Sequence, residues 1–386
     1  MNIVMIGPVY PYKGGIAHYT SLMVRALSKE HTVTMISYKL QYPKILYPRS
    51  SQKDYENISF QVNPTHYLIN TINPLSYFQT AGFIKKLQPE LVILQWWHPF
   101  FSFCYWSLAN LLRKYSKVLF LCHNVFPHEK FPMQRLLARM TLGKGNAFIV
   151  QSKQDEQDLL GLLPNATLIR VVLPTFHAFN MSGIGKNDAR KKLEIETDAR
   201  VLLFFGFVRE YKGLKHLLAA MPMIVEALPR CKLLIVGDIL DNEKEDYLQR
   251  IKQTGCQESI MLFSEYVSDN EVEYYFSACD LVVLPYESAT QSGVVQIAYG
   301  FEKPVVVTSV GGLPEVVLDG KTGFIVPPND HEKIADTVIR FFALDEDGID
   351  AFAKGIREEA DKYSWDRMNE IISQLYISCT KDKEQS

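Results

Sequence analysis

The chain has 386 residues, 47% of them hydrophobic and 22% charged, with a formal net charge of −2. This length and composition are typical of a globular protein with two domains. The near-zero charge gives no electrostatic footprint for nucleic acid, so we expect no nucleic-acid partner. The six cysteines form no C-x-x-C pair, and several lie in apolar runs, which favours free thiols in a reducing cytoplasm.

The sequence predicts no membrane anchor. Its first residues, MNIVMIGPVYPYKGG, lack the basic stretch and long apolar run of a signal peptide. Residues 91–112 have the length of a membrane span, but they include Gln95, His98 and Pro99, which a lipid-facing helix tolerates poorly. A buried strand followed by a buried helix accounts for this stretch better, so we expect a cytoplasmic protein.

Short apolar runs that end in turn residues alternate with longer segments of helical periodicity. Apolar stripes at spacings of three and four over 16–27 and 214–225 predict amphipathic helices. Strands that alternate with helices predict parallel sheets covered on both faces, and this α/β pattern occurs twice. The runs expected to be strands are 2–6, 33–37, 91–94, 117–122, 147–150, 201–205, 232–236, 260–263, 281–284 and 305–308, with a short strand within 319–328.

The boundary between the two halves is predicted in LPTFHAFNMSGIGK (173–186), where proline, glycine and polar residues interrupt the periodicity. We therefore expect a first domain over 1–176 and a second over 186–364. A last helix over 365–380 is expected to pack back on the first domain.

Ligands of open parallel sheets bind beyond the carboxyl ends of the strands, where loops lead into helices. In the first such loop, PVYPYKGGI (8–16), Gly14 and Gly15 open the next helix, so backbone amides can approach an anion there. The spacing is not G-x-G-x-x-G, which argues against a dinucleotide cofactor. An ordinary tight turn accounts for the glycine pair equally well.

Two loops of the second half offer stronger candidates. In FGFVREYKGL (205–214), Arg209 and Lys212 stand between a strand and a helix, where two cations can clamp a diphosphate, although a solvated basic loop has the same pattern. In PYESATQSGVVQ (285–296), the residues from Ser292 begin a helix whose free amides can hold phosphate. Gly311 and Gly312 follow the next strand in the same way.

Five motifs make a resemblance specific. They are G-x-x-R-x-x-K-G at 206–213, IVGD at 235–238, F-x-x-Y-V at 263–267, G-G-x-P-E at 311–315 and D-G-x-T-G at 319–323. With them, the second half resembles the donor domain of family 4 glycosyltransferases, retaining enzymes of the GT-B fold, in which two Rossmann-like domains face a central cleft. The first half is similar more loosely, through its glycine pair and CHNVFPHE at 122–129.

The resemblance implies roles for particular residues of this chain. The donor diphosphate is expected to be bound by Arg209 and Lys212, with the departing charge stabilised there. His123 lies where the family has a histidine near the transferred sugar, and Glu129 follows in the same loop. The remaining donor contacts implied are Gly14, Gly15, Gly206, the Tyr266 and Val267 backbone at the base, and the amides of Ser292, Gly293 and Val294.

One pattern departs from the family. Its members normally carry two glutamates eight apart, one near the sugar and one on the ribose hydroxyls. The corresponding positions here are Ala289 and Ile297, whereas Glu287 lies two residues before the first and Gln296 lies next to the second. Either Glu287 and Gln296 take over through a local shift, or the donor contacts differ.

The acceptor side is less defined. His98, after a Trp-Trp pair, is a candidate acceptor contact together with Glu129, although a packed aromatic corner also accounts for it. The basic, amphipathic segment 130–144 suits either an ordinary surface helix or peripheral contact with an anionic membrane that carries a lipid-linked acceptor. No cluster has metal-ligand spacing and no D-x-D follows a strand, so we expect no metal and no cofactor.

The sequence thus predicts a metal-independent, retaining glycosyltransferase of polysaccharide or glycoconjugate synthesis. It is expected to move a sugar from a UDP- or GDP-linked donor to a saccharide or lipid-linked acceptor. Two alternatives stay open: a non-catalytic nucleotide-sugar-binding subunit, favoured by the missing glutamate pair, and a sugar-nucleotide epimerase of the same architecture.

Overall fold

The computed structural model describes residues 1–46, 52–55, 58–127, 131–265 and 267–381. The chain divides into two compact units: unit 1 is Met1–Val172 with Trp365–Ser386, and unit 2 is Leu173–Ser364. Residues 173–176 therefore group with the second unit, because the Thr175 N–H donates to the Tyr363 carbonyl (2.9 Å) and the Phe176 N–H to the Gln296 carbonyl (3.2 Å).

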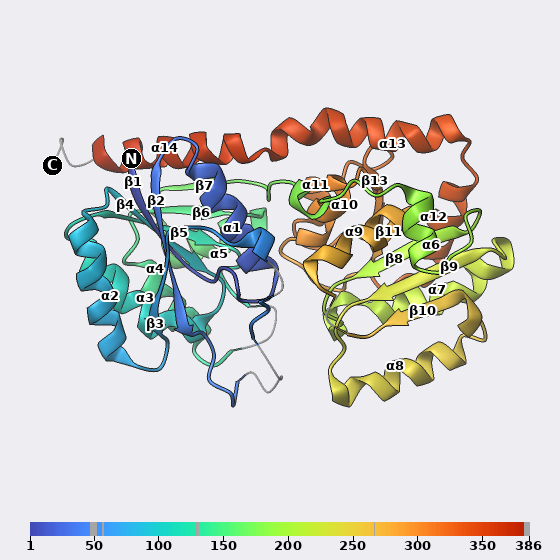
Figure 1. The fold of residues 1–386 in the computed structure, drawn as a ribbon, viewed down its shortest axis with the longest axis horizontal. Coiled ribbons are helices and arrows are strands. Elements are labelled where there is room, and N and C mark those ends of the chain that lie inside the picture. Colours follow the sequence, from blue (N-terminus) through green and yellow to red (C-terminus); the bar gives the residue numbers. More distant parts are fainter. Residues whose placement is uncertain (47–51, 56–57, 128–130, 266, 382–386) are drawn as a thin grey trace. The chain divides into compact units, whose positions relative to one another are not determined.

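Unit 1 is built on a seven-stranded sheet in the order β3-β2-β1-β4-β5-β6-β7, in which paired strands run parallel. Helices cover both faces of the sheet (Figure 1). Its elements are β1 Asn2–Ile6, α1 Gly15–Leu27, β2 Thr32–Leu40, η1 Ile58–Phe60, β3 Thr65–Asn70, α2 Pro74–Leu87, β4 Leu91–Trp96, η2 Pro99–Phe101, α3 Ser102–Leu112, β5 Lys117–Cys122, α4 Gln134–Leu142, β6 Ala147–Val150, α5 Lys153–Leu162, β7 Leu168–Arg170 and α14 Trp365–Lys381.

Unit 2 repeats the plan with a six-stranded parallel sheet in the order β10-β9-β8-β11-β12-β13. Its elements are η3 His177–Phe179, α6 Lys186–Lys192, β8 Arg200–Phe205, η4 Glu210–Lys212, α7 Leu214–Ala227, β9 Cys231–Val236, α8 Asp241–Gln253, η5 Gln257–Ser259, β10 Ile260–Phe263, α9 Asp269–Ala278, β11 Leu281–Leu284, α10 Gly293–Gly300, β12 Val305–Thr308, α11 Leu313–Val316, β13 Gly323–Val326, α12 His331–Phe342, α13 Glu346–Glu359 and η6 Ala360–Tyr363.

The central strands explain why both sheets form. All six residues of β4 and all four of β11 and of β12 are buried, which is the pattern of parallel strands covered on both faces. The expected strands all form, and two further strands, β3 and β7, occupy the edges of the first sheet. The predicted helices also form, as α1, α7 and α14.

The last helix, α14, belongs to unit 1. Its Asn369 side-chain amide donates to the Ala26 carbonyl at the end of α1 (2.9 Å), and the Trp365 ring lies 5.2 Å from that of Tyr19. The chain thus returns to its first unit after completing the second. None of the helices among the described ranges is both long and apolar enough to cross a membrane. All six cysteines are free thiols.

Candidate functional site

The strand orders place a switch point in each sheet. In unit 2 the chain runs outward from β8 to β9 and β10, then returns to β11 on the other side of β8. The strands β8 and β11 are neighbours, but the loops that follow them lead away in opposite directions. This leaves a crevice at the carboxyl ends of the two strands, which is where ligands of such sheets bind. These loops carry Arg209, Lys212, Glu287 and Ser292, so the topology brings the predicted donor residues of unit 2 to one edge.

Two glycines let the loop after β8 fold tightly. Gly206 (φ 101°) and Gly213 (φ 65°) both adopt the left-handed region, which other residues enter only with strain. A Cβ at Gly213 would lie 2.0 Å from the Pro285 carbonyl oxygen, so only glycine allows the two loops to approach this closely. A Cβ at Gly206 would meet the Lys212 ammonium at 2.9 Å. The ammonium therefore folds back over the carboxyl end of β8.

Lys212 and Arg209 form a pair of neighbouring cations. Lys212 is half-buried, and its Nζ lies 5.7 Å from the centre of the Tyr286 ring. Burial, and then the charge of Arg209, lower the pKa of Lys212 to about 8. The Arg209 guanidinium donates to the Val208 carbonyl (3.0 Å). Two cations held together away from water are stabilised by an anion between them.

Glu287 lies in the loop after β11 and connects it to the loop after β8. Its backbone N–H donates to the Tyr211 carbonyl (2.7 Å), and its carboxylate contacts His216 Nε2 (2.7 Å) and Lys215 Nζ (2.9 Å) at the start of α7. Burial opposes ionisation, but the hydrogen bonds from Lys215 and His216 outweigh it and lower the pKa of Glu287. The side chain is 27% exposed. The carboxylate is thus ionised and held toward α7.

Helix α10 begins where the sequence predicts an anion site. Ser292 is its N-cap, and Gly293 and Val294 form its first turn, so their amides belong to the positive end of the helix. Gln296, predicted as a donor contact, is 1% exposed, and its amide oxygen accepts from the Thr175 hydroxyl (3.4 Å). It faces the segment at the start of unit 2.

The base-side residues lie before α9. Val267 is half-buried and directly precedes Ser268, whose side chain forms a capping box with Glu271 at the start of that helix. Tyr266 lies outside the described residues. The role of the Tyr266 and Val267 backbone stays a prediction.

In unit 1 the switch point lies between β1 and β4. Gly14 (φ 108°) is the N-cap of α1 and Gly15 its first residue. Among the residues that the structure describes, none would lie within 4 Å of a Cβ added at either glycine. Gly14 is required for its backbone angle rather than for close packing, which is compatible with a phosphate approaching the amides.

His123 follows β5 and is 3% exposed. Its Nε2 lies 2.6 Å from the Gln95 side-chain oxygen, an acceptor, so Nε2 carries the proton. The Tyr19 ring packs edge-on against it at 4.9 Å. Burial, opposed by a hydrogen bond with Gln151, lowers the pKa of His123 to about 3. The imidazole is therefore neutral, and suits hydrogen bonding better than proton transfer.

The acceptor candidates are only partly described. His98 follows β4 and caps η2, where its Nδ1 accepts from the Phe100 N–H (3.1 Å) and its ring lies edge-on to Phe131 at 4.9 Å. This is a packed aromatic corner whose histidine is still half-exposed. Glu129 lies outside the described residues, as does the neighbouring His128.

Sequence reasoning did not find the partners of these side chains. Gln95, wholly buried within β4, orients His123 from 28 positions away. The one signal for it was a polar residue inside the apolar run LVILQWW. Lys215 and His216, which hold Glu287, stand in the first turn of α7, and the sequence analysis assigned them no role. Within the described part of the chain, no group of three or more His, Cys, Asp or Glu residues could hold a metal ion.

Comparison with known families gives two matches. Residues 13–174 match the model of Glycosyltransferase Family 4, and residues 185–359 match that of Glycosyl transferases group 1. Among curated proteins, an uncharacterized glycosyltransferase of Methanocaldococcus jannaschii is 30% identical over 203 residues, which are 51% of this chain and 50% of that protein. The D-inositol 3-phosphate glycosyltransferase of Streptomyces scabiei is 26% identical over 204 residues, 51% of this chain and 46% of the relative. The chain thus spans about half the length of the curated relatives it matches.

Solved structures agree over nearly the whole chain. Sucrose-phosphate synthase from Thermosynechococcus elongatus is 19% identical, with a TM-score of 0.75 over 99% of both chains. The Anabaena protein HepE, solved with UDP and glucose, is 16% identical, with a TM-score of 0.75 over 98% of this chain and 100% of its own. At these identities the likeness establishes the fold. The family models and the fold together show that the chain belongs to the family 4 glycosyltransferases and has the GT-B architecture.

Proposed function

We propose that this chain transfers a sugar, with retention of configuration and without a metal ion, from a nucleoside-diphosphate donor to a saccharide or lipid-linked acceptor. The observation that carries the proposal is the pair of cations, Arg209 and Lys212, in the loop after β8. Burial of Lys212, and then its repulsion by Arg209, keep its pKa low, and the negative charge of a diphosphate would offset both effects. The amides at the start of α10 add donors at the same sheet edge.

The proposed chemistry follows from where charge develops. When the sugar–oxygen bond breaks, negative charge builds up on the β-phosphate, and fixed cations and amides stabilise it most where water is scarce. The same phosphate oxygen then accepts the proton of the attacking acceptor hydroxyl on the same face of the sugar. Sugar–oxygen cleavage, acceptor–sugar bond formation and proton transfer to phosphate balance without a metal. We assign no covalent nucleophile.

The donor class is tested by binding. A UDP- or GDP-sugar is proposed, and HepE, which has the same fold, was solved with UDP. A panel of UDP-, GDP- and ADP-sugars is compared by the shift in melting temperature, since binding to the native state stabilises it. We expect one base to stabilise the wild type and the Arg209→Ala/Lys212→Ala protein to lose that shift. A panel with no stabilising member would overturn the proposed donor binding.

Product analysis separates transfer from the two alternatives. The donor found above is incubated with and without acceptors, and its products are identified by NMR. Transfer gives an α- or β-glycoside with the donor's configuration. An epimerised nucleotide sugar from donor alone would identify an epimerase. Donor binding with no turnover on saccharide or lipid-linked acceptors would identify a binding subunit, which the absence of glutamate at Ala289 and Ile297 favours.

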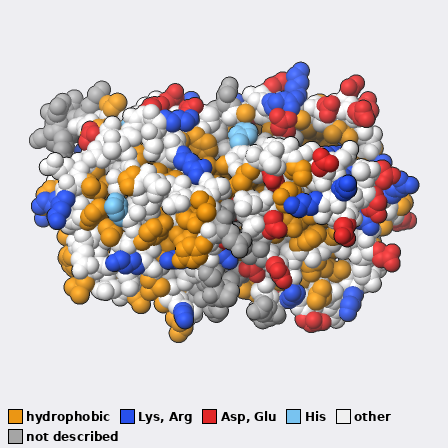
Figure 2. Space-filling model, viewed as in Figure 1, with side chains coloured by type: hydrophobic (Ala, Val, Ile, Leu, Met, Phe, Trp, Pro, Cys, Tyr) orange, Lys and Arg blue, Asp and Glu red, His pale blue; other side chains and the backbone are white. Residues whose placement is uncertain are grey.

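The acceptor is proposed to lie at a membrane surface, reached from the cytoplasm. Helices α2, α3 and α4 pack side by side in unit 1 and expose Leu75 (69%), Phe78 (60%), Phe103 (67%) and Leu136 (58%). The same helices carry the basic residues Lys85, Lys86, Arg135 and Arg139. Figure 2 shows both hydrophobic and basic side chains over the region that α2 occupies in Figure 1. Apolar and basic groups together fit an anionic lipid surface.

Vesicle sedimentation tests this contact. The wild type should co-sediment with vesicles that contain phosphatidylglycerol and much less with pure phosphatidylcholine. Leu75→Glu/Phe78→Glu should abolish that binding, whereas Leu344→Glu on unit 2, also partly exposed, should not. Equal sedimentation of both variants would refute the surface.

A further inference from the structure

Tyr286 lies just after β11 and is 3% exposed. Its main chain is held on both sides. The Tyr286 N–H donates to the Leu284 carbonyl (2.9 Å), and the Tyr286 carbonyl accepts from the Thr308 hydroxyl at the end of β12 (2.5 Å). The residue is thus anchored to two strands, and its ring and its hydroxyl meet different parts of the proposed donor site.

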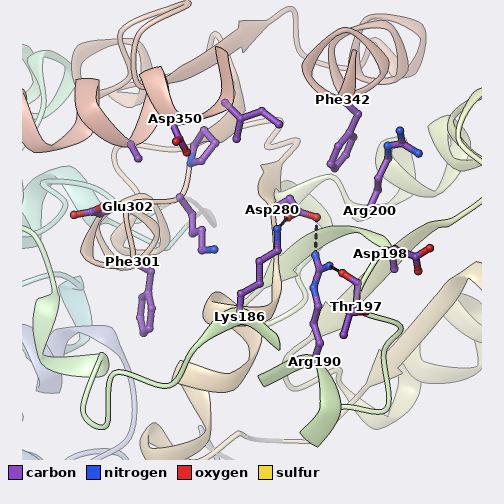
Figure 3. Close-up of a pocket in the computed structure, with 15 residues that line it drawn as sticks. Lys186, Arg190, Thr197, Asp198, Arg200, Asp280, Phe301, Glu302, Phe342 and Asp350 are labelled. Carbon is purple, nitrogen blue, oxygen red and sulfur yellow. Dashed lines mark hydrogen bonds and ion pairs between the residues drawn. The ribbon is translucent and has the colours of Figure 1, made fainter. Parts of the chain in front are cut away.

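The strands that carry this site are also held together at their other ends. Asp280, directly before β11, accepts from the Val201 N–H of β8 (2.8 Å) and binds Arg190 Nη2 (2.9 Å) and Lys186 Nζ (2.5 Å). Figure 3 shows Lys186 and Arg190 converging on Asp280. Because β8 and β11 are paired and tied at their amino ends, the loops at their carboxyl ends start from fixed positions.

The Lys212 ammonium lies over the Tyr286 ring, with 5.7 Å between Nζ and the ring centre. A Cβ at Gly206 would lie 2.9 Å from the same Nζ and 3.7 Å from Val294 Cγ2, so the ammonium and the first turn of α10 lie around one point. The face of an aromatic ring attracts a cation, most of all where water is excluded. The ring therefore favours the position of the ammonium next to the start of α10.

The Tyr286 hydroxyl faces Ser292, the N-cap of α10. A serine at this position normally accepts a hydrogen bond from an amide of the first turn. The Ser292 side chain accepts from none of the amides of that turn, all of which the structure describes, and its Oγ lies 3.5 Å from the Tyr286 hydroxyl oxygen, a long contact. Burial raises the pKa of Tyr286 and outweighs the opposing effect of Ser292, so the hydroxyl stays protonated. A serine turned toward Tyr286 leaves the α10 amides to a ligand.

We propose that Tyr286 is a positioning residue of the donor site. Its ring holds the Lys212 ammonium, and its hydroxyl keeps the Ser292 side chain away from the α10 amides. One buried side chain thereby sets the spacing between two groups of phosphate donors, and donors fixed in advance lose less conformational freedom on binding. This role rests on the proposed function, since the ligand is the donor diphosphate. Tyr286 acts through Lys212 and Ser292 and does not itself contact the substrate.

Calorimetry with inorganic pyrophosphate, UDP and GDP tests this role. Tyr286→Leu removes the ring and the hydroxyl, and it should weaken diphosphate binding roughly tenfold, as expected for losing a desolvated contact between a cation and a ring. Tyr286→Phe keeps the ring and should weaken binding about threefold, because Ser292 then turns back to cap its own helix.

Double-mutant cycles separate positioning from general support of the fold. In a Lys212→Met protein, Tyr286→Leu should weaken binding by only about threefold, since the contact with the ammonium is already lost. In a Ser292→Ala protein, Tyr286→Phe should have no further effect. Losses that are the same in every background would overturn the role, because a side chain that only supports the fold weakens all of them equally.

Tyr299→Leu is the matched control, because Tyr299 is 2% exposed and its hydroxyl donates to Thr322 (2.7 Å) near the end of α10. It should leave the Kd of the probes unchanged. Circular dichroism and melting curves check that each variant folds, and if Tyr286→Leu does not fold, Tyr286→Phe and its cycle decide alone. Wild-type affinity in the folded Tyr286 variants overturns only the positioning role. A wild type that binds none of the three probes contradicts the proposed donor site, and this role with it.

Discussion

Replacing Lys212 with methionine should stabilise the free protein while it weakens nucleotide binding. Methionine keeps most of the aliphatic stem and removes the charge. The pKa of Lys212 falls from 10.5 to about 8, because the ammonium is buried and lies near Arg209. Each unit of such a shift corresponds to about 1.4 kcal/mol, so the charged lysine costs the unliganded fold about 1–3 kcal/mol after allowance for partial exposure.

The direction of the Lys212 pKa shift determines the pH range in which the variant is more stable. Below pH 8 the lysine is charged in both the folded and unfolded chain, so the full cost is present and the variant gains most. Between about pH 8 and the ordinary lysine pKa, only the unfolded chain keeps the proton, and the advantage of Lys212→Met declines. In the bound state the same charge contacts the diphosphate, and its loss should cost about 1.5–3 kcal/mol, or at least tenfold in Kd.

Urea unfolding from pH 6 to 10, and calorimetry with the nucleoside diphosphate, measure the two effects. Lys215→Met is the matched control, because Lys215 stands three residues later and its pKa is raised by the hydrogen bonds that it donates to Glu210 and Glu287. Its removal should slightly destabilise the protein. The reasoning is refuted if Lys212→Met lowers the free energy of unfolding at pH 7, or if it leaves nucleotide affinity unchanged in a folded protein.

Four further predictions concern the rest of the site. Excess EDTA should leave initial transfer rates unaltered, and loss of activity restored by Mg²⁺ or Mn²⁺ would contradict metal independence. Glu287→Gln should bind the free nucleoside diphosphate almost normally but lower kcat with the full donor, so wild-type kcat would exclude a sugar-side role. Because the pKa of His123 is about 3 in the folded protein, His123 takes up a proton first in the unfolded chain as the pH falls. The free energy of unfolding should therefore drop below about pH 6.5, by at most about 1.4 kcal/mol per pH unit. For His123→Gln the free energy of unfolding should depend less steeply on pH, and an unchanged slope would contradict this. Gly213→Ala should lower the free energy of unfolding by more than about 2 kcal/mol, since its Cβ would clash with Pro285. Gly320→Ala is the control, because Gly320 has a similar φ of 73° but no described atom near its Cβ position, and it should cost about 1 kcal/mol. Equal losses in melting experiments would exclude the clash.

The central strands were predictable because burial on both faces leaves a continuous apolar run. The strands β1, β5, β6, β10, β11 and β12 have the bounds that the sequence predicts. The edge strand β3, THYLIN, is mostly half-buried, and β7 has only three residues, LIR. Neither gives a run that stands out from a loop, and both form because the neighbouring strand offers its free edge.

The loops of the candidate site were predictable from position, but their contacts were not. The glycines and cations after β8, and the helix start after β11, indicate an anion site, because turn chemistry and charge are local properties. The bond between His123 and Gln95, and that between Glu287 and His216, join residues 28 and 71 positions apart. Such pairs depend on strand register and loop path, which no local pattern encodes.

The two positions where the family carries glutamates bear on the role of Glu287. Ala289 and Ile297, where the family carries its glutamates, are 6% and 8% exposed, and a Cβ at Gly311 would meet the Ala289 carbonyl, so this loop is packed inward. A carboxylate restored at either position would have to leave water, which is costly unless it gains a hydrogen-bond partner.

The Glu287 carboxylate instead binds His216 and Lys215 of α7, the helix that follows the cation pair. If it turns to the sugar when donor binds, Glu287→Gln lowers kcat and spares nucleotide affinity. If it only positions the loop that carries Lys212, the same substitution weakens the free nucleoside diphosphate itself, and His216→Ala does so too. The Kd of the nucleotide, measured without any sugar, therefore separates a carboxylate that contacts substrate from one that orients the clamp.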